Sequence, residues 1–135
     1  MNTSRPTLIQ VCAFIKRHYK PARLWTREQL VPFVEWYWLD ARAAVIRERG
    51  RIVALAMARC MNTLEEATEP FHHNEAGQIV WIDDIVSLHP NGIGALMTLA
   101  SQRFGEREWF AGHVFNRNGE LRKLPWKLVD RIFKI

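Results

Sequence analysis

The spacing of apolar side chains changes twice along this chain of 135 residues, and this constrains the fold more than any other feature. Residues 7–19 carry apolar side chains three or four positions apart, as do Leu30, Phe33, Val34 and Tyr37 after a capping pattern at Thr26, and this predicts two amphipathic helices, the second kinked at Pro32 or beginning after Thr26. Residues 43–60 and 78–88 instead carry short apolar runs, which predict strands. From residue 93 to 104 the helical spacing returns. Helices before and after a block of strands predict an α/β fold.

Length and composition favour one globular domain over residues 1–135. Hydrophobic residues make up 48% and charged residues 24% of the chain, as in ordinary packed domains. Local signals support the predicted elements: Thr26 with Gln29 forms a capping-box pattern, and Gly50 follows charged residues in a turn that predicts a hairpin. Two further strands are predicted over 109–115 and 126–135, the second as a strand or strand-like tail.

Several protein classes are excluded or disfavoured by the sequence. No apolar run approaches the about 18 residues of a membrane-spanning helix, and the first residues lack the layout of a secretion signal. Cys12 and Cys60 are too few for a disulfide scaffold, so we expect a reducing, cytoplasmic location. We predict no metal site, because the five residues considered as ligands match no known spacing: His72, His73, Asp83, Asp84 and His89.

Charge is unevenly distributed along the sequence. The formal net charge is +5, yet residues 62–90 contain six acidic residues and no Lys or Arg. The other residues hold all 19 positive and eight negative charges, a net of +11. This division predicts an anionic partner. A basic cluster near the end, interleaved with Trp126 and Phe133, would also suit nucleic acid: Arg117, Arg122, Lys123, Lys127, Arg131 and Lys134.

The most informative motif is a Gly-x-Gly turn between a predicted strand and a predicted helix. His89 and Pro90 end the strand, and residues 91–94 read Asn-Gly-Ile-Gly before the helical spacing begins. Glycines at such a junction let backbone amides approach a ligand, and the helix N-terminus adds partial positive charge. A phosphate or pyrophosphate is the occupant this chemistry favours, although a tight turn needs glycine for structural reasons alone.

The order of predicted elements resembles the GNAT superfamily of N-acetyltransferases over nearly the whole chain. Ala43–Ala58 (AAVIRERGRIVALAMA) is similar to the family's second and third strands. Val86–Met97 (VSLHPNGIGALM) is similar to its phosphate loop, and Asn116–Trp126 (NRNGELRKLPW) to its Asn, helix and Leu-Gly-Phe element. The resemblance implies N-terminal helices and a mixed, mostly antiparallel sheet whose central strand splays from its neighbour.

The resemblance also implies a binding site for acetyl-CoA or another acyl-CoA. By matching position, the backbone amides of the loop would donate to pyrophosphate, and the central strand would face pantetheine through its backbone. The residues implied in cofactor binding are Val86, Leu88, His89, Asn91, Gly92, Ile93, Gly94, Ala95 and Asn116. The sequence departs from the family pattern at two points. The basic loop anchor is absent, and the position of the family's Tyr general acid falls near Leu121.

Catalysis on an amine would need a base. Asp83 and Asp84 are adjacent on the predicted central strand, so strand alternation predicts that their side chains point to opposite faces and that one reaches the cleft. A structural role for the pair is the competing interpretation. His89 or His113 could serve instead, although a packed strand residue is an equally ordinary role for His113.

The sequence therefore predicts acyl-CoA-dependent N-acylation, with acetyl-CoA as the expected donor and a small-molecule or protein amine as acceptor. Two alternatives remain open. A GNAT-like fold without catalysis would act as a structural or interaction protein, as in bacteriophage, and form a homo-oligomer or bind another protein. A nucleic-acid-binding module would use the basic C-terminal residues. No membrane partner is expected.

Overall fold

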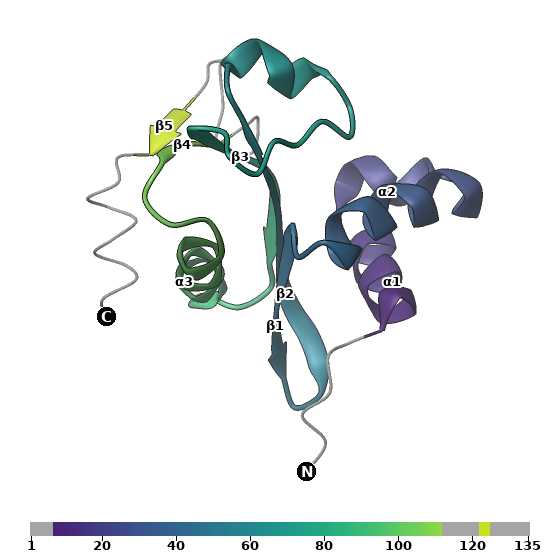
Figure 1. Ribbon diagram of the computed structural model, residues 1–135. Helices are drawn as coiled ribbons and strands as arrows, with labels where there is room; N and C mark the ends of the chain where they lie inside the picture. Colours follow the sequence, from purple (N-terminus) through teal and green to yellow (C-terminus); the bar gives the residue numbers. More distant parts are fainter. Residues whose placement is uncertain (1–6, 112–121, 125–135) are drawn as a thin grey trace.

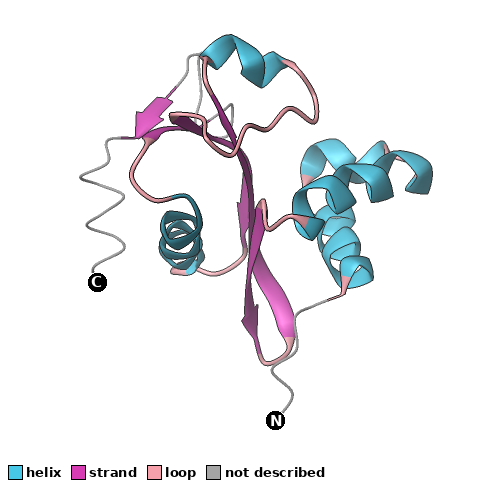
Figure 2. Ribbon diagram, viewed as in Figure 1, coloured by secondary structure: helices cyan, strands magenta, loops and turns pink. Residues whose placement is uncertain are grey.

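The computed structural model describes residues 7–111 and 122–124. Its core is a five-stranded sheet in the order β1-β2-β3-β4-β5, with α1 and α2 on one face and α3 on the other (Figure 1). The secondary structure follows the predicted order (Figure 2). The elements are α1 (Leu8–His18), η1 (Lys20–Leu24), α2 (Arg27–Leu39), β1 (Ala43–Glu48), β2 (Arg51–Met61), η2 (Leu64–Thr68), β3 (Ile79–Ser87), α3 (Gly92–Phe104), β4 (Glu108–Ala111) and β5 (Arg122–Leu124).

The N-terminal helices begin where their capping residues predict. Thr26 accepts from the Gln29 amide, and the Gln29 side chain accepts from the Thr26 amide, so the capping box satisfies two otherwise unbonded donors. Pro32 lies inside α2 without ending the helix. The apolar faces of α1 and α2 pack against the sheet around Leu55 and Met57. The buried residues at this contact form the larger part of the core.

The β1–β2 hairpin confirms the predicted charged turn. Glu48 pairs with Arg51, so Arg49 and Gly50 form a two-residue loop, and both have positive φ, of 55° and 80°. This conformation matches the twist of a hairpin and suits glycine at its second position. The hairpin thus fixes the register of β2, on which β3 pairs.

The register between β2 and β3 corrects the predicted alternation of the two aspartates. Met57 pairs with Asp84 and Ala58 with Ile82, so Asp83 is the extra residue of a β-bulge. Because the bulge absorbs one residue, Asp84 shares a face with its partner Met57, which packs under α1 and α2. Asp83 reaches Tyr37 of α2. Both carboxylates therefore lie on the α1–α2 face, and the prediction of opposite faces is wrong.

The central strand β3 pairs with an antiparallel neighbour, β2, on one side and with a parallel neighbour, β4, on the other. Four pairs join β3 to β4, from Ile79 with Glu108 to Ile82 with Ala111. The described part of β4 ends at Ala111, while β3 stays paired with β2 as far as Ser87. The other described pairs are antiparallel, which confirms the predicted mixed, mostly antiparallel sheet; the predicted splay of the central strand falls beyond Ala111, outside the described residues.

Helix α3 covers the opposite face of the sheet. Leu96, Met97, Ala100 and Phe104 are buried there, and Gly105 ends the helix with a φ of 72°. Within the described residues, no helix combines the length and apolarity needed to cross a bilayer. The expectations for His113, Asn116, Leu121 and the tail 126–135 lie outside the described residues, as does most of the basic C-terminal cluster.

Gly92 is required by packing, which yields a testable prediction. A Cβ at this position would collide with the Ser87 hydroxyl and lie 3.0 Å from the Ala54 Cβ. We expect Gly92→Ala to lower the free energy of unfolding by about 1–3 kcal/mol in urea denaturation, because α3 must shift off the sheet.

The exposed neighbour gives the control for this prediction. Ile93→Ala should change stability by less than about 0.5 kcal/mol. Adding Ser87→Ala to Gly92→Ala should restore part of the loss. A Gly92→Ala protein as stable as the wild type would show that the junction is loosely packed.

Candidate functional site

Two aspartates and two tyrosines meet at the bulge of β3, on the face covered by α1 and α2. The Tyr37 hydroxyl donates to Asp83 Oδ2 at 2.8 Å, and the Tyr19 hydroxyl hydrogen-bonds Asp84. Arg59 of β2 completes the group, which we call the bulge site: Tyr19, Tyr37, Arg59, Asp83 and Asp84. The sequence indicated that both tyrosines belong to the N-terminal helices, but it gave no signal that they meet the aspartates.

Arg59 joins the bulge site to the loop between β2 and β3, residues 62–78, which we call the acidic loop. Its Nε lies 3.0 Å from Asp83 Oδ2, and its terminal nitrogens donate to the carbonyl oxygens of Ala67, Glu69 and His72. Arg59 is only 4% exposed. Since a buried guanidinium needs partners for its donors, these carbonyls and the Asp83 carboxylate together account for its burial.

Burial sets the acidity of the two carboxyl groups. Loss of solvent raises the pKa of Asp84 to about 7; the charge of Asp83 adds to this rise, and the Tyr19 hydrogen bond opposes it. Burial also raises the pKa of Asp83, against the opposing effects of Arg59 and Tyr37. Asp84 can therefore exchange a proton near neutral pH, a property suited to a general base.

The two tyrosines stay protonated in this setting. Burial, reinforced by the neighbouring carboxylates, raises the pKa of Tyr19 and of Tyr37 above the usual phenol value. Their hydroxyls therefore act as hydrogen-bond donors that orient Asp84 and Asp83. Neither tyrosine occupies the position near Leu121 at which the resemblance places the family's acid.

The turn between β3 and α3 lies at the other end of the strand. The Gly92 amide donates to the His89 carbonyl at 3.0 Å, and the Asn91 amide donates to His89 Nδ1 at 3.2 Å. The first helical bond runs from the Ala95 amide to the Asn91 carbonyl, and the Asn91 side chain makes no capping bond. In the part of the chain that is described, this leaves the amides of Ile93 and Gly94 as the open first-turn donors.

The backbone of β3 between the bulge and the turn is bonded to β2 along one side. The Leu88 amide donates to the Val53 carbonyl at 2.8 Å, so Leu88 and, two residues earlier, Val86 direct their backbone groups toward β2. By alternation, the backbone groups of Ile85 and Ser87 point away from β2, toward the side of the sheet on which β4 lies. The sequence-based choice of Val86 and Leu88 is therefore displaced by one residue along the strand.

The histidines considered as metal ligands are spread over different contacts. His72 lies between Glu66 and Glu69, at 3.4 and 3.3 Å, whereas His89 lies 3.6 Å from Glu48. Among the described residues, no three His, Cys, Asp or Glu side chains converge as a metal site would require. His73 accepts from the Cys60 amide and contacts Glu75, which indicates a role in holding the acidic loop on β2.

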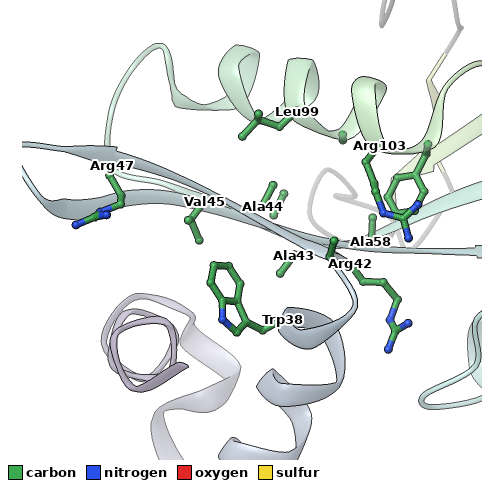
Figure 3. Close-up of a pocket in the computed structure, with 13 residues that line it drawn as sticks. Trp38, Arg42, Ala43, Ala44, Val45, Arg47, Ala58, Leu99 and Arg103 are labelled. Atoms are coloured by element: carbon green, nitrogen blue, oxygen red, sulfur yellow. The ribbon is translucent and has the colours of Figure 1, made fainter. Parts of the chain in front are cut away.

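A cavity of about 480 Å³ lies away from the bulge site, at the outer edge of β1 beneath α3. Figure 3 shows Leu99 and Trp38 approaching it from opposite sides of the sheet. Two of the arginines that line the cavity are bonded to carboxylates. Arg42 forms an ion pair with Asp40, and the two terminal nitrogens of Arg103 donate to the two carboxylate oxygens of Glu75. Because β2 separates this cavity from β3, it is not part of the candidate site.

Two solved structures share the architecture built up above. One is described as the GphF GNAT-like decarboxylase in complex with isobutyryl-CoA; it has a TM-score of 0.55, 20% sequence identity and a match over 80% of this chain. The present chain spans 62% of that protein's length. The other is the loading GNATL domain of CurA from Lyngbya majuscula, with a TM-score of 0.54, 13% identity and coverage of 97% and 82% of the two chains.

This chain has the GNAT fold. The parallel pair β3–β4, the glycine turn into α3 and the two structural matches together confirm the fold that the resemblance implied. No protein-family model and no curated protein matches the sequence. The bulge site and the β3–α3 turn lie at opposite ends of the last part of β3, residues 84–87.

Proposed function

We propose that this GNAT-fold protein binds an acyl-CoA, with acetyl-CoA as the expected donor, and transfers the acyl group to an amine. The observation that carries the proposal is the stretch of β3 that joins the glycine turn, with its unbonded first-turn amides, to a buried carboxylate pair. A matching GNAT-fold structure holds isobutyryl-CoA, which supports an acyl-CoA as the ligand.

In this proposal the donor lies along β3, where unbonded backbone groups suit its parts. The amides of Ile93 and Gly94, at the positive end of α3, suit the pyrophosphate. The outward backbone groups of Ile85 and Ser87 suit the amides of the pantetheine arm, which would add to the sheet as a strand does. This path directs the thioester toward Asp83 and Asp84.

The acceptor chemistry follows from the carboxylates. Asp84, with a pKa near 7, can take a proton from the attacking ammonium directly or through one water. The amine nitrogen then forms a bond to the thioester carbon, the carbon–sulfur bond breaks, and the thiolate leaves with a proton from solvent or from Asp84. Arg59 neutralises Asp83, so Asp84 supplies the charge that attracts a cationic acceptor.

Decarboxylation of a carboxyacyl-CoA is the rival reaction, because one matching structure is described as a decarboxylase. It would bring a third carboxylate beside Asp83 and Asp84, and like charges at such distances repel in a poorly solvated site. The bulge site therefore favours an amine. Mass spectrometry after incubation with acetyl-CoA plus an amine panel, or with a carboxyacyl-CoA alone, separates the two reactions.

Binding of the donor is tested with one charge at the start of α3. Ile93 is 42% exposed, so Ile93→Glu should fold normally and gain slightly from the helix dipole. The same negative charge repels pyrophosphate, and we expect affinity for acetyl-CoA to fall about tenfold in isothermal titration calorimetry.

Gln102→Glu is the matched control, because it adds the same charge near the far end of α3. We expect its affinity for acetyl-CoA to stay within about twofold of the wild type. If both variants lose affinity for acetyl-CoA equally, the β3–α3 turn is not the pyrophosphate site. A wild-type protein with no thermal shift in millimolar acetyl-CoA would overturn the proposed function and favour a GNAT fold without catalysis.

A further inference from the structure

Strand β1 lies at the end of the sheet, and its outer edge borders a cavity. The sheet order begins with β1, and among the described residues β1 pairs only with β2. The cavity of about 480 Å³ follows this edge, with Trp38 on one side of the sheet and Leu99 on the other (Figure 3). An unpaired strand edge offers a row of backbone donors and acceptors with which another strand can pair.

Alternation along the strand determines which backbone groups point outward. The carbonyl of Arg42, directly before β1, accepts from the Ala58 amide at 2.8 Å, so Arg42 directs its backbone toward β2, as does Ala44 two residues later. Ala43 and Val45 therefore present their backbone groups at the outer edge, where they line the cavity. The first four residues of β1 are apolar and include neither Lys nor Pro, which natural sheets use to protect an edge.

Two copies of β1 can pair antiparallel in two registers near the middle of the strand. The irregular pairing with β2 leaves Val53 of β2 unpaired, so β1 itself alternates regularly as far as Glu48. Because outward-facing backbone groups must meet across a two-fold axis, the axis passes through either Ala44 or Val45. An axis through Ala44 would place Asp40 of one copy opposite Glu48 of the other, and like charges directly opposite each other destabilise a strand pair.

The register centred on Val45 is complementary in its apolar and its charged residues. The Val45 side chains of the two copies form the central pair, and Ala44 lies opposite Ile46 on the face covered by α3. Toward the ends of the strand, Arg42 lies opposite Glu48. Pairs of β-branched residues and pairs of opposite charge both stabilise antiparallel strands. Charge therefore favours this register, and it favours a second copy of the chain as the occupant of the edge.

Arg42 provides a second observation in favour of this register. Its side chain is only 8% exposed, and one terminal nitrogen donates to Asp40 and to the Trp36 carbonyl. Its Nε is buried and has no hydrogen-bond partner within the described residues. A buried donor without an acceptor is unfavourable. The exposed carboxylate of Glu48 from a second copy, opposite Arg42 in the register centred on Val45, can supply the missing acceptor.

We propose that two copies of this chain associate through the outer edges of their β1 strands, paired antiparallel with Val45 on the two-fold axis. The two sheets then form one continuous sheet, and both copies of α3 lie on the same side of it. Leu99, which lines the cavity and is 37% exposed, becomes covered. The inference does not depend on the proposed function, because β2 separates this edge from the bulge site.

Analytical ultracentrifugation of the full chain tests the association. We expect the wild-type protein to be mostly dimeric at about 100 μM and mostly monomeric at about 1 μM, as for a small interface. Val45→Lys and Val45→Glu each place like charges on the axis and should weaken association at least about tenfold. An equimolar mixture of the two variants should recover affinity to within about threefold of the wild type. Ile9→Lys, at a position on α1 that is 79% exposed, is the control and should dimerise as the wild type does.

Cysteine cross-linking tests the register. The Cα atoms of a hydrogen-bonded antiparallel pair lie about 5.5 Å apart, within reach of a disulfide, whereas diagonal neighbours lie about 7–8 Å apart. Oxidised glutathione should therefore cross-link the dimer of Val45→Cys but not that of Ala44→Cys. Cys12 and Cys60 are buried and present in both variants, so the comparison also controls for the native thiols.

Each result supports or overturns the proposed interface. A wild-type chain that stays monomeric at about 100 μM overturns it, as does a Val45→Lys variant that dimerises as tightly as the wild type. A mixture of Val45→Lys and Val45→Glu that stays monomeric, or a cross-link in Ala44→Cys instead of Val45→Cys, overturns the placement of Val45 on the axis. Circular dichroism and thermal melting verify that each variant is folded.

Discussion

Asp84→Asn will stabilise the protein at pH 8 and slow the proposed acyl transfer by about a hundredfold or more. The pKa of Asp84 is about 7 in the fold against 3.8 for the free side chain, so the folded state binds its proton more tightly than the unfolded state does. Stability contributed by this group therefore falls as pH rises from about 4 to 7. Asparagine is neutral and keeps an acceptor for Tyr19. At pH 8 we expect a gain of about 3–4 kcal/mol in the free energy of unfolding.

The measurement is a pair of urea titrations, at pH 4.5 and pH 8. The two proteins should differ little at pH 4.5, where Asp84 is protonated in the fold, and the difference should appear at pH 8. Glu35→Gln, an exposed change on α2, should leave stability within about 0.5 kcal/mol at both pH values. A variant less stable than the wild type at pH 8 would show that the ionised carboxylate is well solvated or paired.

Activity gives the second half of this prediction. If Asp84 is the base, its amide should reduce kcat by about a hundredfold or more while acetyl-CoA still binds. The pH profile of the wild-type rate should rise through the pKa of about 7. If the Asp84→Asn variant keeps full activity, Asp84 is not the general base and its role is structural.

Arg59→Met will have the largest effect on stability among single changes in the bulge site. It removes the partner of Asp83 and the donors to three loop carbonyls, those of Ala67, Glu69 and His72. Loss of one member of a buried ion pair costs about 3–5 kcal/mol, because the remaining charge stays buried. We expect this loss in urea denaturation at pH 7.

The size of the loss should depend on Asp83. Arg59→Met/Asp83→Leu removes both charges and should recover part of the stability, whereas the loop carbonyls remain unbonded. Arg23→Met, at an exposed position, serves as the control and should be nearly neutral. If Arg59→Met costs less than about 1 kcal/mol, water must replace the guanidinium within the site.

The sequence predicted the elements of the fold because each depends on local signals. Periodicity, the capping residue Thr26 and the turn at Gly50 act within a few residues of one another. The bulge at Asp83 could not be predicted, because it depends on how β3 pairs with β2, some twenty residues away along the chain. Without the bulge, alternation gives the wrong face for one aspartate.

The sequence singled out some residues of the candidate site but did not predict which side chains contact one another there. The aspartates and the glycine turn were identified from their positions in the motif, but Tyr19, Tyr37 and Arg59 were missed as their partners. Their burial followed from helical and strand spacing, whereas contact across 46 residues, as between Tyr37 and Asp83, follows only from packing. Gly92 was selected for ligand approach, and the structure adds a packing reason for it.

The bulge in β3 also bears on how a strand of this kind can change in evolution. Deleting Asp83, the extra residue of the bulge, would restore strict alternation and leave Asp84 as the single acid on this face. Local charge density at the centre of the sheet would fall while the helices and the hairpin kept their sequences. One inserted or deleted codon could therefore switch the chemistry of this surface, where substitutions alone would need several steps.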